Sequence, residues 1–419
     1  MAGVRREWPG AVELTVRLAA GARKGSSQEA PAARQGTSQE APADLAASAA
    51  APADLAAPAA PAQEIRALAY PALTGRPEPG DRVLLNTTAL DLGLGTGGYA
   101  LVVAVPDRLP PDRSGPGHLV KARYTPLQAV VLGADEQGSP HHATLRDADE
   151  IAGMPVVVAD LHSALPAVLA GLFRNPERSP AAGPDGPGAR PRAVYVMTDG
   201  GALPAWFSRT CATLRDAGWL AGTVTVGQAF GGDLEAVTLH TGLLAARHVL
   251  GADVAVVAQG PGNLGTGTRW GFSGVAAGEA VNAAAALAGR PVASLRVSEA
   301  DPRDRHRGIS HHSLTSYGRV ALARADVVVP VMPGEFGARV AAQAEPLAAR
   351  HALVRVEVGG LDEALRRCPA RLSTMGRGLD EDRADFLAAA AAGRHAAALL
   401  RDPAGSRPDG RANNGTRPT

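Results

Sequence analysis

Short apolar runs alternate with longer helical stretches along the second half of the chain. Four of the runs lead directly into a polar or glycine-rich turn, namely Ala193–Met197, Gly222–Val226, Asp253–Ala258 and Pro291–Val297. Strands that alternate with helices are typical of βαβ units, whose strands form a parallel sheet. The pattern predicts an α/β fold, with a doubly wound, mostly parallel sheet over residues 151–400. Ligands bind such a sheet outside the carboxyl ends of its strands, so we expect these turns to share one crevice.

Residues 64–150 show shorter strand-type runs that are separated by turn signals. They predict a smaller N-terminal β-barrel or sandwich-like domain, to which residues 1–21 add a strand. The runs Val12–Leu18 and Glu64–Tyr70 are expected to form one hairpin with an enlarged loop, because loop-closure entropy grows slowly with length.

The loop of that hairpin, residues 22–63, is rich in alanine and proline. The unit Ser-Gln-Glu-Ala-Pro-Ala occurs at Ser27–Ala32 and again at Ser38–Ala43. Such a composition cannot bury a core, so we expect a disordered insert. A flexible loop over 175–192 and a disordered tail over 401–419 are also predicted.

Composition narrows the class of protein. The 419 residues carry 42 basic and 41 acidic side chains, and 4% are aromatic, which disfavours nucleic acid or an anionic membrane as a partner. The two cysteines, Cys211 and Cys368, cannot form a disulfide framework or a CxxC metal site. The charged segment Met1–Pro9 is not followed by the apolar core of a signal peptide. No apolar run is long enough to span a membrane, so we expect a cytoplasmic protein.

Asp199 follows the first of the four strands and precedes Gly200 and Gly201, which are candidate anion-binding residues. A carboxylate there can bind a metal ion or act as a general base in the crevice. It can equally cap the next helix, because Asp is a preferred N-cap residue. The sequence leaves both roles open.

Gly231 and Gly232 precede Asp233 and a helix predicted near Ala236–Leu250. Successive glycines let backbone N–H groups point at an anion, and the helix would add its positive end. Asp233 is a second candidate catalytic carboxylate, with a plain turn capped by Asp233 as the alternative.

The segment Gly260–Gly265 has the G-x-G-x-x-G pattern, with a strand before it and a predicted helix after it. Pro261 lies inside the turn and no acidic residue follows at the required spacing, so an NAD or flavin cofactor is not favoured. The pattern still predicts a cradle for a phosphate or carboxylate, formed by Gly260, Gly262, Gly265, Thr266, Gly267 and Thr268.

Residues 301–315 hold the densest group of polar side chains. The candidate catalytic residues are Asp301, His306, His311 and His312, and the candidate anion-binding residues are Arg303, Arg305 and Arg307. Histidine ligates metals or moves protons near neutral pH, and arginine binds phosphate or carboxylate oxygens. The histidine spacing matches no standard zinc motif, and a solvated basic loop is the alternative. The position after a buried-type strand favours a functional loop.

Several strings together resemble an uncharacterised bacterial family, the domain of unknown function 3866. They are Leu85–Ala89, Leu94–Gly98, Tyr124–Gln128, Met197–Pro204, Ala229–Ala236, Gly260–Gly262, Gly265–Thr268 and Arg305–Thr315. The resemblance extends over about residues 12–331, apart from the insert and the loop over 175–192. It implies no reaction and transfers no catalytic residue.

We therefore expect a hydrolase or transferase that acts on a small anionic or phosphorylated metabolite at the carboxyl ends of the parallel sheet. A divalent metal is the candidate cofactor, with Asp199, Asp233 and His311 as candidate ligands. The alternative is a non-catalytic small-molecule sensor or binding module that uses the same crevice. Asp160 and His162, which follow an earlier strand, are further candidates to line a cleft. Homo-oligomerisation is left open.

Overall fold

The computed structural model describes residues 1–19, 63–95, 97–112, 115–173 and 190–401. The disorder predicted for 22–63 and 401–419, and the flexible loop predicted for 175–192, fall almost entirely outside these ranges. Contacts divide the chain into two compact units. The first comprises Met1–Glu7, Val12–Ala69 and Arg76–Leu109, and the second comprises Trp8–Ala11, Tyr70–Gly75 and Pro110–Thr419.

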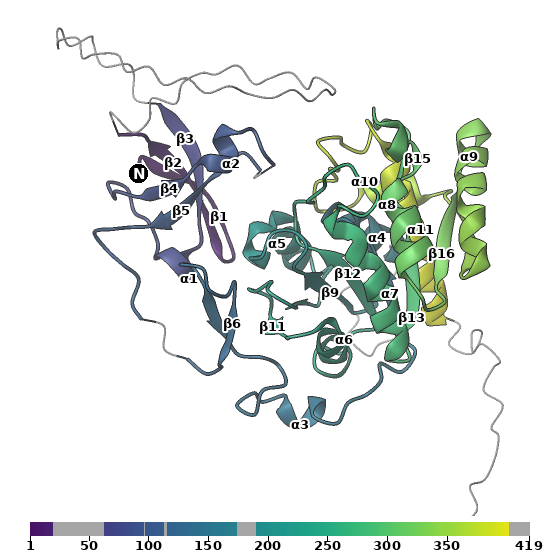
Figure 1. Cartoon of the computed structure of the whole chain (residues 1–419), viewed down its shortest axis with the longest axis horizontal. Coiled ribbons are helices and arrows are strands. Elements are labelled where there is room, and N and C mark those ends of the chain that lie inside the picture. Colours follow the sequence, from purple (N-terminus) through teal and green to yellow (C-terminus); the bar gives the residue numbers. More distant parts are fainter. Residues whose placement is uncertain (20–62, 96, 113–114, 174–189, 402–419) are drawn as a thin grey trace, which may run out of the picture. The chain divides into compact units, whose positions relative to one another are not determined.

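The first unit contains an open, mixed five-stranded sheet in the order β1-β2-β3-β5-β4 (Figure 1). Its strands are β1 (Gly3–Trp8), β2 (Ala11–Arg17), β3 (Glu64–Ala69), β4 (Leu84–Asn86) and β5 (Ala100–Ala104), and helix α2 spans Thr88–Asp91. The predicted hairpin is present, since β2 and β3 pair antiparallel from Val12–Ala69 to Arg17–Glu64. No closed barrel forms among the described strands. Strand β1 was not predicted from the sequence, because most of its side chains are exposed and give no apolar pattern.

The second unit is built on an eight-stranded sheet in the order β11-β10-β9-β12-β8-β13-β16-β17, and all its strand pairs are parallel. The strands are β8 (Pro155–Val158), β9 (Ala193–Thr198), β10 (Gly222–Thr225), β11 (Leu234–Glu235), β12 (Val254–Gln259), β13 (Arg290–Ser294), β16 (Asp326–Val331) and β17 (Ala352–Glu357). The predicted parallel α/β sheet is confirmed.

Both faces of this sheet are covered by helices (Figure 1). Successive strand residues point to opposite faces, so Val156 and Val158 join one hydrophobic core while Val157 joins the other. The first core also takes α6 (Leu239–His248), α7 (Ala276–Ala286) and α9 (Gly334–Ala344). The second takes α4 (Leu165–Leu172), α5 (Arg209–Asp216), α10 (Leu361–Arg366) and most of α11 (Arg383–Arg401). This is the doubly wound arrangement.

Helices α4 and α11 approach each other through glycine. A Cβ atom on Gly171 would lie 1.8 Å from the carbonyl oxygen of Ala390, and one on Gly393 would lie 1.9 Å from that of Val168. Both distances are far below van der Waals contact, so this helix crossing requires glycine at both positions.

Smaller elements of the second unit complete the fold. They are α1 (Pro71–Thr74), the antiparallel hairpin of β6 (Leu119–Lys121) and β7 (Ala129–Val131), and α3 (His142–Leu145). Lys121 is buried, and its Nζ lies 2.9 Å from Glu235 Oε2 and contacts three backbone carbonyl oxygens. Burial lowers the pKa of Lys121, and the Glu235 carboxylate opposes that shift. None of the described helices is long and apolar enough to cross a membrane.

Candidate functional site

Three neighbouring central strands, β12, β8 and β13, bring Gln259, Asp160 and Arg296 to the same edge of the sheet. All three side chains are buried. The hydroxyl of Tyr317 lies 2.9 Å from Val158 O and 3.1 Å from Ser294 O, so it links the carboxyl ends of β8 and β13. The site is therefore built on rigid strand ends.

A closed loop brings distant histidines together. Strands β14 (Val297–Ser298) and β15 (Gly308–Ile309) pair antiparallel, so the intervening residues 299–307 leave the sheet and return beside it. Gly308 has φ 74°, and a Cβ atom there would lie 2.1 Å from Gln343 Oε1, which accepts the Ile309 N–H. Helix α8 (His311–Thr315) begins directly after this loop.

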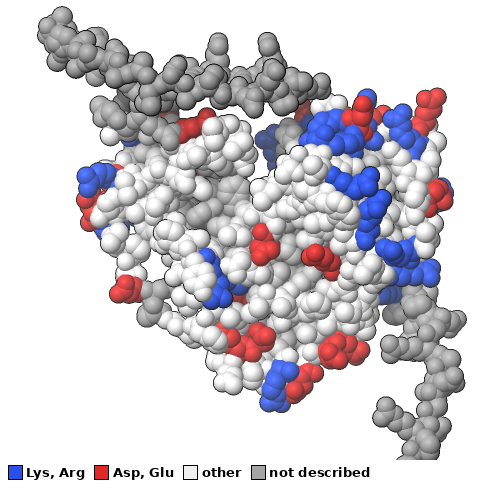
Figure 2. Space-filling view, in the orientation of Figure 1, with Lys and Arg blue, Asp and Glu red and all other residues white. Residues whose placement is uncertain are grey.

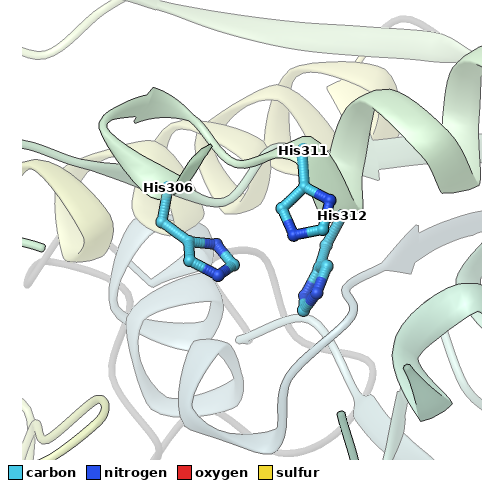
Figure 3. A group of neighbouring side chains, drawn as sticks. All are labelled: His306, His311 and His312. Carbon is cyan, nitrogen blue, oxygen red and sulfur yellow. The ribbon is translucent and has the colours of Figure 1, made fainter. Parts of the chain in front are cut away.

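His306, His311 and His312 form one cluster. The ring centroids of His311 and His312 are 4.3 Å apart, and His306 is 4.9 Å from each. Figure 3 shows the His306 ring, which comes from the loop, facing the two rings at the start of α8. One ring nitrogen of each histidine lies within 4.8 Å of the other two. A tetrahedral ion with Zn–N bonds of about 2.0–2.1 Å needs nitrogens roughly 3.4 Å apart, so ring movements of about 1 Å would complete such a site.

Surrounding contacts hold two of the three rings. His306 Nδ1 lies 2.8 Å from Ser310 Oγ, which also accepts the His312 N–H and caps α8. A donated Nδ1–H leaves the Nε2 lone pair of His306 free for an ion, as is usual for metal-binding histidines. His312 stacks on Phe272 with a centroid distance of 3.8 Å and an interplanar angle of 2°.

Unpartnered polar atoms gather around this cluster. Among the described residues, buried side-chain atoms without a hydrogen-bond partner include Asp160 Oδ2, Gln259 Oε1, His311 Nε2 and His312 Nδ1. Asp160 Oδ2 lies 4.0 Å from His312 Nδ1, which is too far for a hydrogen bond. Buried polar groups in native proteins are almost always satisfied, so these atoms indicate a place for water, an ion or a ligand.

The histidines are neutral at pH 7. Burial lowers the pKa of His306 and of His312 to about 3, and it also lowers the pKa of His311. The charges of Arg296 and Arg303 add to each of these shifts. A neutral imidazole is the form that ligates a metal. Burial raises the pKa of Asp160, while Arg296 opposes that shift.

Asp301 anchors the loop instead of lying open to a substrate. Its carboxylate is 1% exposed, and it accepts hydrogen bonds from Arg303 Nε and Nη2 at 2.9 and 2.8 Å and from Arg377 Nη2 at 3.3 Å. Arg296 Nη2 lies 3.9 Å away. These bonds hold the pKa of Asp301 well below its usual range. Arg303 is thereby engaged by Asp301.

Arg305 and Arg307 are exposed, and neither forms an ion pair with another described residue. Arg305 Nη2 is the atom nearest to a Cβ built on Gly267, at 3.8 Å, and its charge lowers the pKa of His311. Arg305 thus lies between the glycine-rich loop and the histidines. Figure 2 shows basic side chains gathering near the positions of β15 and α9 in Figure 1, with acidic side chains among them. Arg305 is therefore an exposed positive charge close to His311.

Asp199 lies near β10 and not among the histidines. It is exposed, and its Oδ2 accepts the Gln228 N–H at 2.8 Å. Strand β9 is separated from β8 by β12, and adjacent strands are about 4.8 Å apart, so Asp199 starts roughly 10 Å from the end of β8. Gly200 and Gly201 pack closely against the loop after β12. A Cβ atom on Gly200 would lie 2.4 Å from Gln259 Oε1, and one on Gly201 would lie 2.1 Å from Gly260 O.

Asp233 lies toward the amino end of the sheet. Its carboxylate accepts hydrogen bonds from the Thr223 N–H and hydroxyl and pairs with Arg215. The N–H groups of Gly231 and Gly232 are already bonded to Glu235 Oε1 and Thr225 Oγ1. Strand β11 follows these residues, and α6 begins only at Leu239. The N–H groups expected to bind an anion at Gly231 and Gly232 are thus bonded within the protein, and no helix begins directly behind them.

The loop after β12, residues 260–272, is mostly exposed to solvent. An antiparallel bridge joins Gly265 to Phe272, and α7 begins only at Ala276, after a 3₁₀ turn. The hydroxyls of Thr266 and Thr268 bond within the loop, to each other and to the backbone of Gly271. The predicted helix does follow, but it begins only at Ala276, so its N-terminus does not lie directly behind Gly260, Gly262, Gly265 and Gly267.

Sequence reasoning gave too little weight to several buried residues. Arg296, Gln259 and Phe272 were not singled out, and Asp160 was considered only as a cleft residue. Asp160 and Gln259 do carry a local signal, since each is a polar residue at the carboxyl end of an apolar run. Arg296 lies two residues past β13 and carries a similar signal, whereas Phe272 carries none, because only the folded chain places it against the histidines.

The fold and the histidine cluster define an α/β protein with a candidate metal centre at the carboxyl ends of a parallel sheet. The chain belongs to the family described as a protein of unknown function, DUF3866, whose model matches residues 66–393. No curated protein and no solved structure matches the chain. The family description carries no activity, so function must be argued from the site.

Proposed function

We propose that this protein is a metal-assisted hydrolase or transferase that acts on a small anionic or phosphorylated metabolite. The observation that supports it is the cluster of three neutral histidines, two of them with an unpartnered buried nitrogen. In this proposal His306, His311 and His312 hold one divalent ion, and they replace Asp199 and Asp233 as the candidate ligands. A bound ion of this kind polarises a substrate oxygen or lowers the pKa of a bound water.

The residues around the cluster suit that chemistry. Phe272 covers one face of His312 and limits access of water, which strengthens electrostatic interactions in the site. Arg305 would bind the anionic group of the substrate next to His311. The unpartnered Asp160 Oδ2 is an acceptor near His312 that would orient a water or a substrate hydroxyl.

Metal content tests the first part of this proposal. The full-length chain is loaded with Zn²⁺ or Co²⁺, dialysed, and analysed by mass spectrometry and by the visible absorption of Co²⁺. We expect one ion per chain, and a loss of affinity above about 100-fold in His311→Ala, because changes outside the ligand shell already cost about 10- to 100-fold. His240→Ala is the matched control, since His240 is an exposed histidine on α6 of the same unit.

Activity tests the second part. Turnover of phosphate monoesters and of carboxylate esters is measured with Zn²⁺, Mn²⁺ or Mg²⁺. We expect His311→Ala to remove turnover and Arg305→Ala to raise KM by about tenfold, the value of one hydrogen bond to a charged group. Equal ion content and turnover in His311→Ala and His240→Ala would contradict the proposal. Ligands that raise the melting temperature without turnover would favour the sensor instead.

A further inference from the structure

A pocket of about 250 Å³ lies within the second unit, and Gln259 is part of its wall. Its walls are the residues after β8, Leu161–Ser163, the residues after β12, Gly260–Asn263, and part of the segment before α11, Arg371 and Ser373. A water occupies about 30 Å³ in the liquid, so the pocket has room for roughly eight waters or a metabolite of similar size. It lies where ligands bind open α/β sheets.

The pocket wall includes Gln259, whose amide oxygen is buried next to Gly200 and unsatisfied. Its side chain is 4% exposed, and its Nε2 donates to Asp160 O at 2.8 Å and to Asn263 Oδ1 at 2.9 Å. Those two acceptors fix the orientation of the amide, and Oε1 has no donor among the described residues. A buried amide oxygen without a donor costs about 1–3 kcal/mol unless a ligand or a water supplies one.

Asn263 adds donors to the same wall. Its Oδ1 accepts from Gln259 and from the hydroxyl of Ser273, at 2.9 and 3.1 Å. The amide nitrogen of Asn263 has no acceptor among the described residues. His162, by contrast, is occupied, because its two ring nitrogens bond to Tyr195 OH and Ser208 Oγ, and burial lowers its pKa to about 4.

Arg371 supplies the positive charge of the pocket. It is exposed and has no ion-pair partner among the described residues. Gly262 lies opposite with φ 87°, and a Cβ there would meet nothing within 4 Å, so this stretch of backbone is open to a ligand. The wall thus combines one free cation, an unsatisfied acceptor and free amide donors.

We propose that this pocket binds a small organic anion, a carboxylate or a phosphate ester, that also carries a hydroxyl or amine. Arg371 binds the anionic group, and Gln259 Oε1 accepts a hydrogen bond from the hydroxyl or amine. The identification of this anion as the substrate rests on the proposed function. Binding itself requires neither the ion nor the histidines.

Calorimetric titration of the full-length, EDTA-treated protein tests the assignment. The probes are glycerol 3-phosphate and malate, with glycerol as the uncharged control. We expect at least one of the two anions to bind, glycerol not to bind, and the preferred probe to show whether phosphate or carboxylate is recognised. Arg371→Ala should weaken binding at least about tenfold, because it removes a charge-assisted hydrogen bond.

Two further variants separate the pocket from the metal site. Ser373→Trp places a large side chain at an exposed pocket position and should abolish binding, while His311→Ala should leave it unchanged. Arg324→Ala, at an exposed arginine without a described partner, is the matched control. The assignment is wrong if neither anion binds, or if Arg371→Ala and Arg324→Ala bind the probes equally. If His311→Ala loses metal binding but still binds the anion, the pocket is an anion site that does not depend on the metal site.

Discussion

Replacement of Asp301 by asparagine tests whether its carboxylate holds the histidine loop in place. Asp301 is 1% exposed and bonds to Arg303 through both oxygens and to Arg377 through one. Asparagine has almost the same shape but carries no charge. The change therefore removes the ion-pair partner of Arg303, while Arg377 loses one of its two partners and keeps Asp382 Oδ2 at 3.0 Å.

The expected cost follows from the burial of these partners. Removing one member of a buried ion pair costs about 3–5 kcal/mol. The Arg303 side chain is 37% exposed and can regain water, while that of Arg377 is 19% exposed. We therefore expect the lower end of the range, about 3 kcal/mol. With a urea m-value of about 2 kcal/mol/M, the midpoint should fall by roughly 1.5 M.

Tryptophan fluorescence during urea unfolding at pH 7 measures this effect. The four tryptophans, Trp8, Trp206, Trp219 and Trp270, all belong to the second unit, so the signal reports on the unit that holds the loop. Asp304→Asn is the matched control, because Asp304 is exposed in the same loop and should change stability by less than about 0.5 kcal/mol.

Acidification supplies an independent check of sign. Hydrogen bonds from Arg303 lower the pKa of Asp301 in the folded state, so its contribution is present above the unfolded pKa of about 3.9 and is lost as pH falls below that value. The difference between wild type and Asp301→Asn should therefore shrink below about pH 4. Equal midpoints for Asp301→Asn and Asp304→Asn at pH 7 would refute the anchoring role and return Asp301 to the list of catalytic candidates.

Three further changes probe buried features of the second unit by the same unfolding assay. Burial raises the pKa of Asp385 to about 7, so near neutral pH the folded state keeps a proton that the unfolded state loses. The Asp385→Asn variant should therefore be more stable than the wild type, by a margin that grows from pH 5 to 7, levels off above pH 7 and reaches about 1–4 kcal/mol. A difference in unfolding free energy that does not change with pH would contradict this expectation. Lys121→Met should cost about 3–5 kcal/mol because Glu235 stays buried without its partner, and Glu235→Gln in the same chain should recover part of that loss. Gly171→Ala should lower the free energy of unfolding by about 1–3 kcal/mol, because the new Cβ atom would push the backbone at Ala390 away. An unchanged urea midpoint would show that α4 and α11 can move apart at no cost.

The sequence alone determined the local elements of this protein. Apolar runs such as Val254–Ala258 are buried on both faces, and that pattern specifies central strands of a parallel sheet without reference to the rest of the chain. The hairpin of β2 and β3 followed from two alternating runs, although many residues separate them. Polar residues directly after apolar runs marked the edge of the sheet at which the candidate site lies. These signals are short-range, so they survive without tertiary information.

The tertiary structure decided which of those polar residues meet. Asp199 and Asp160 look alike in sequence, since both follow an apolar strand, but the strand order places β8 beside β13 and leaves β9 farther away. Strand order depends on how the crossover helices pack, and no local pattern encodes it. His306 likewise reaches His311 and His312 only because β14 pairs with β15 and returns the loop to α8. The geometry of the histidine cluster is therefore a property of the packed fold, whereas the sheet that supports it can be read from the order of apolar and polar residues.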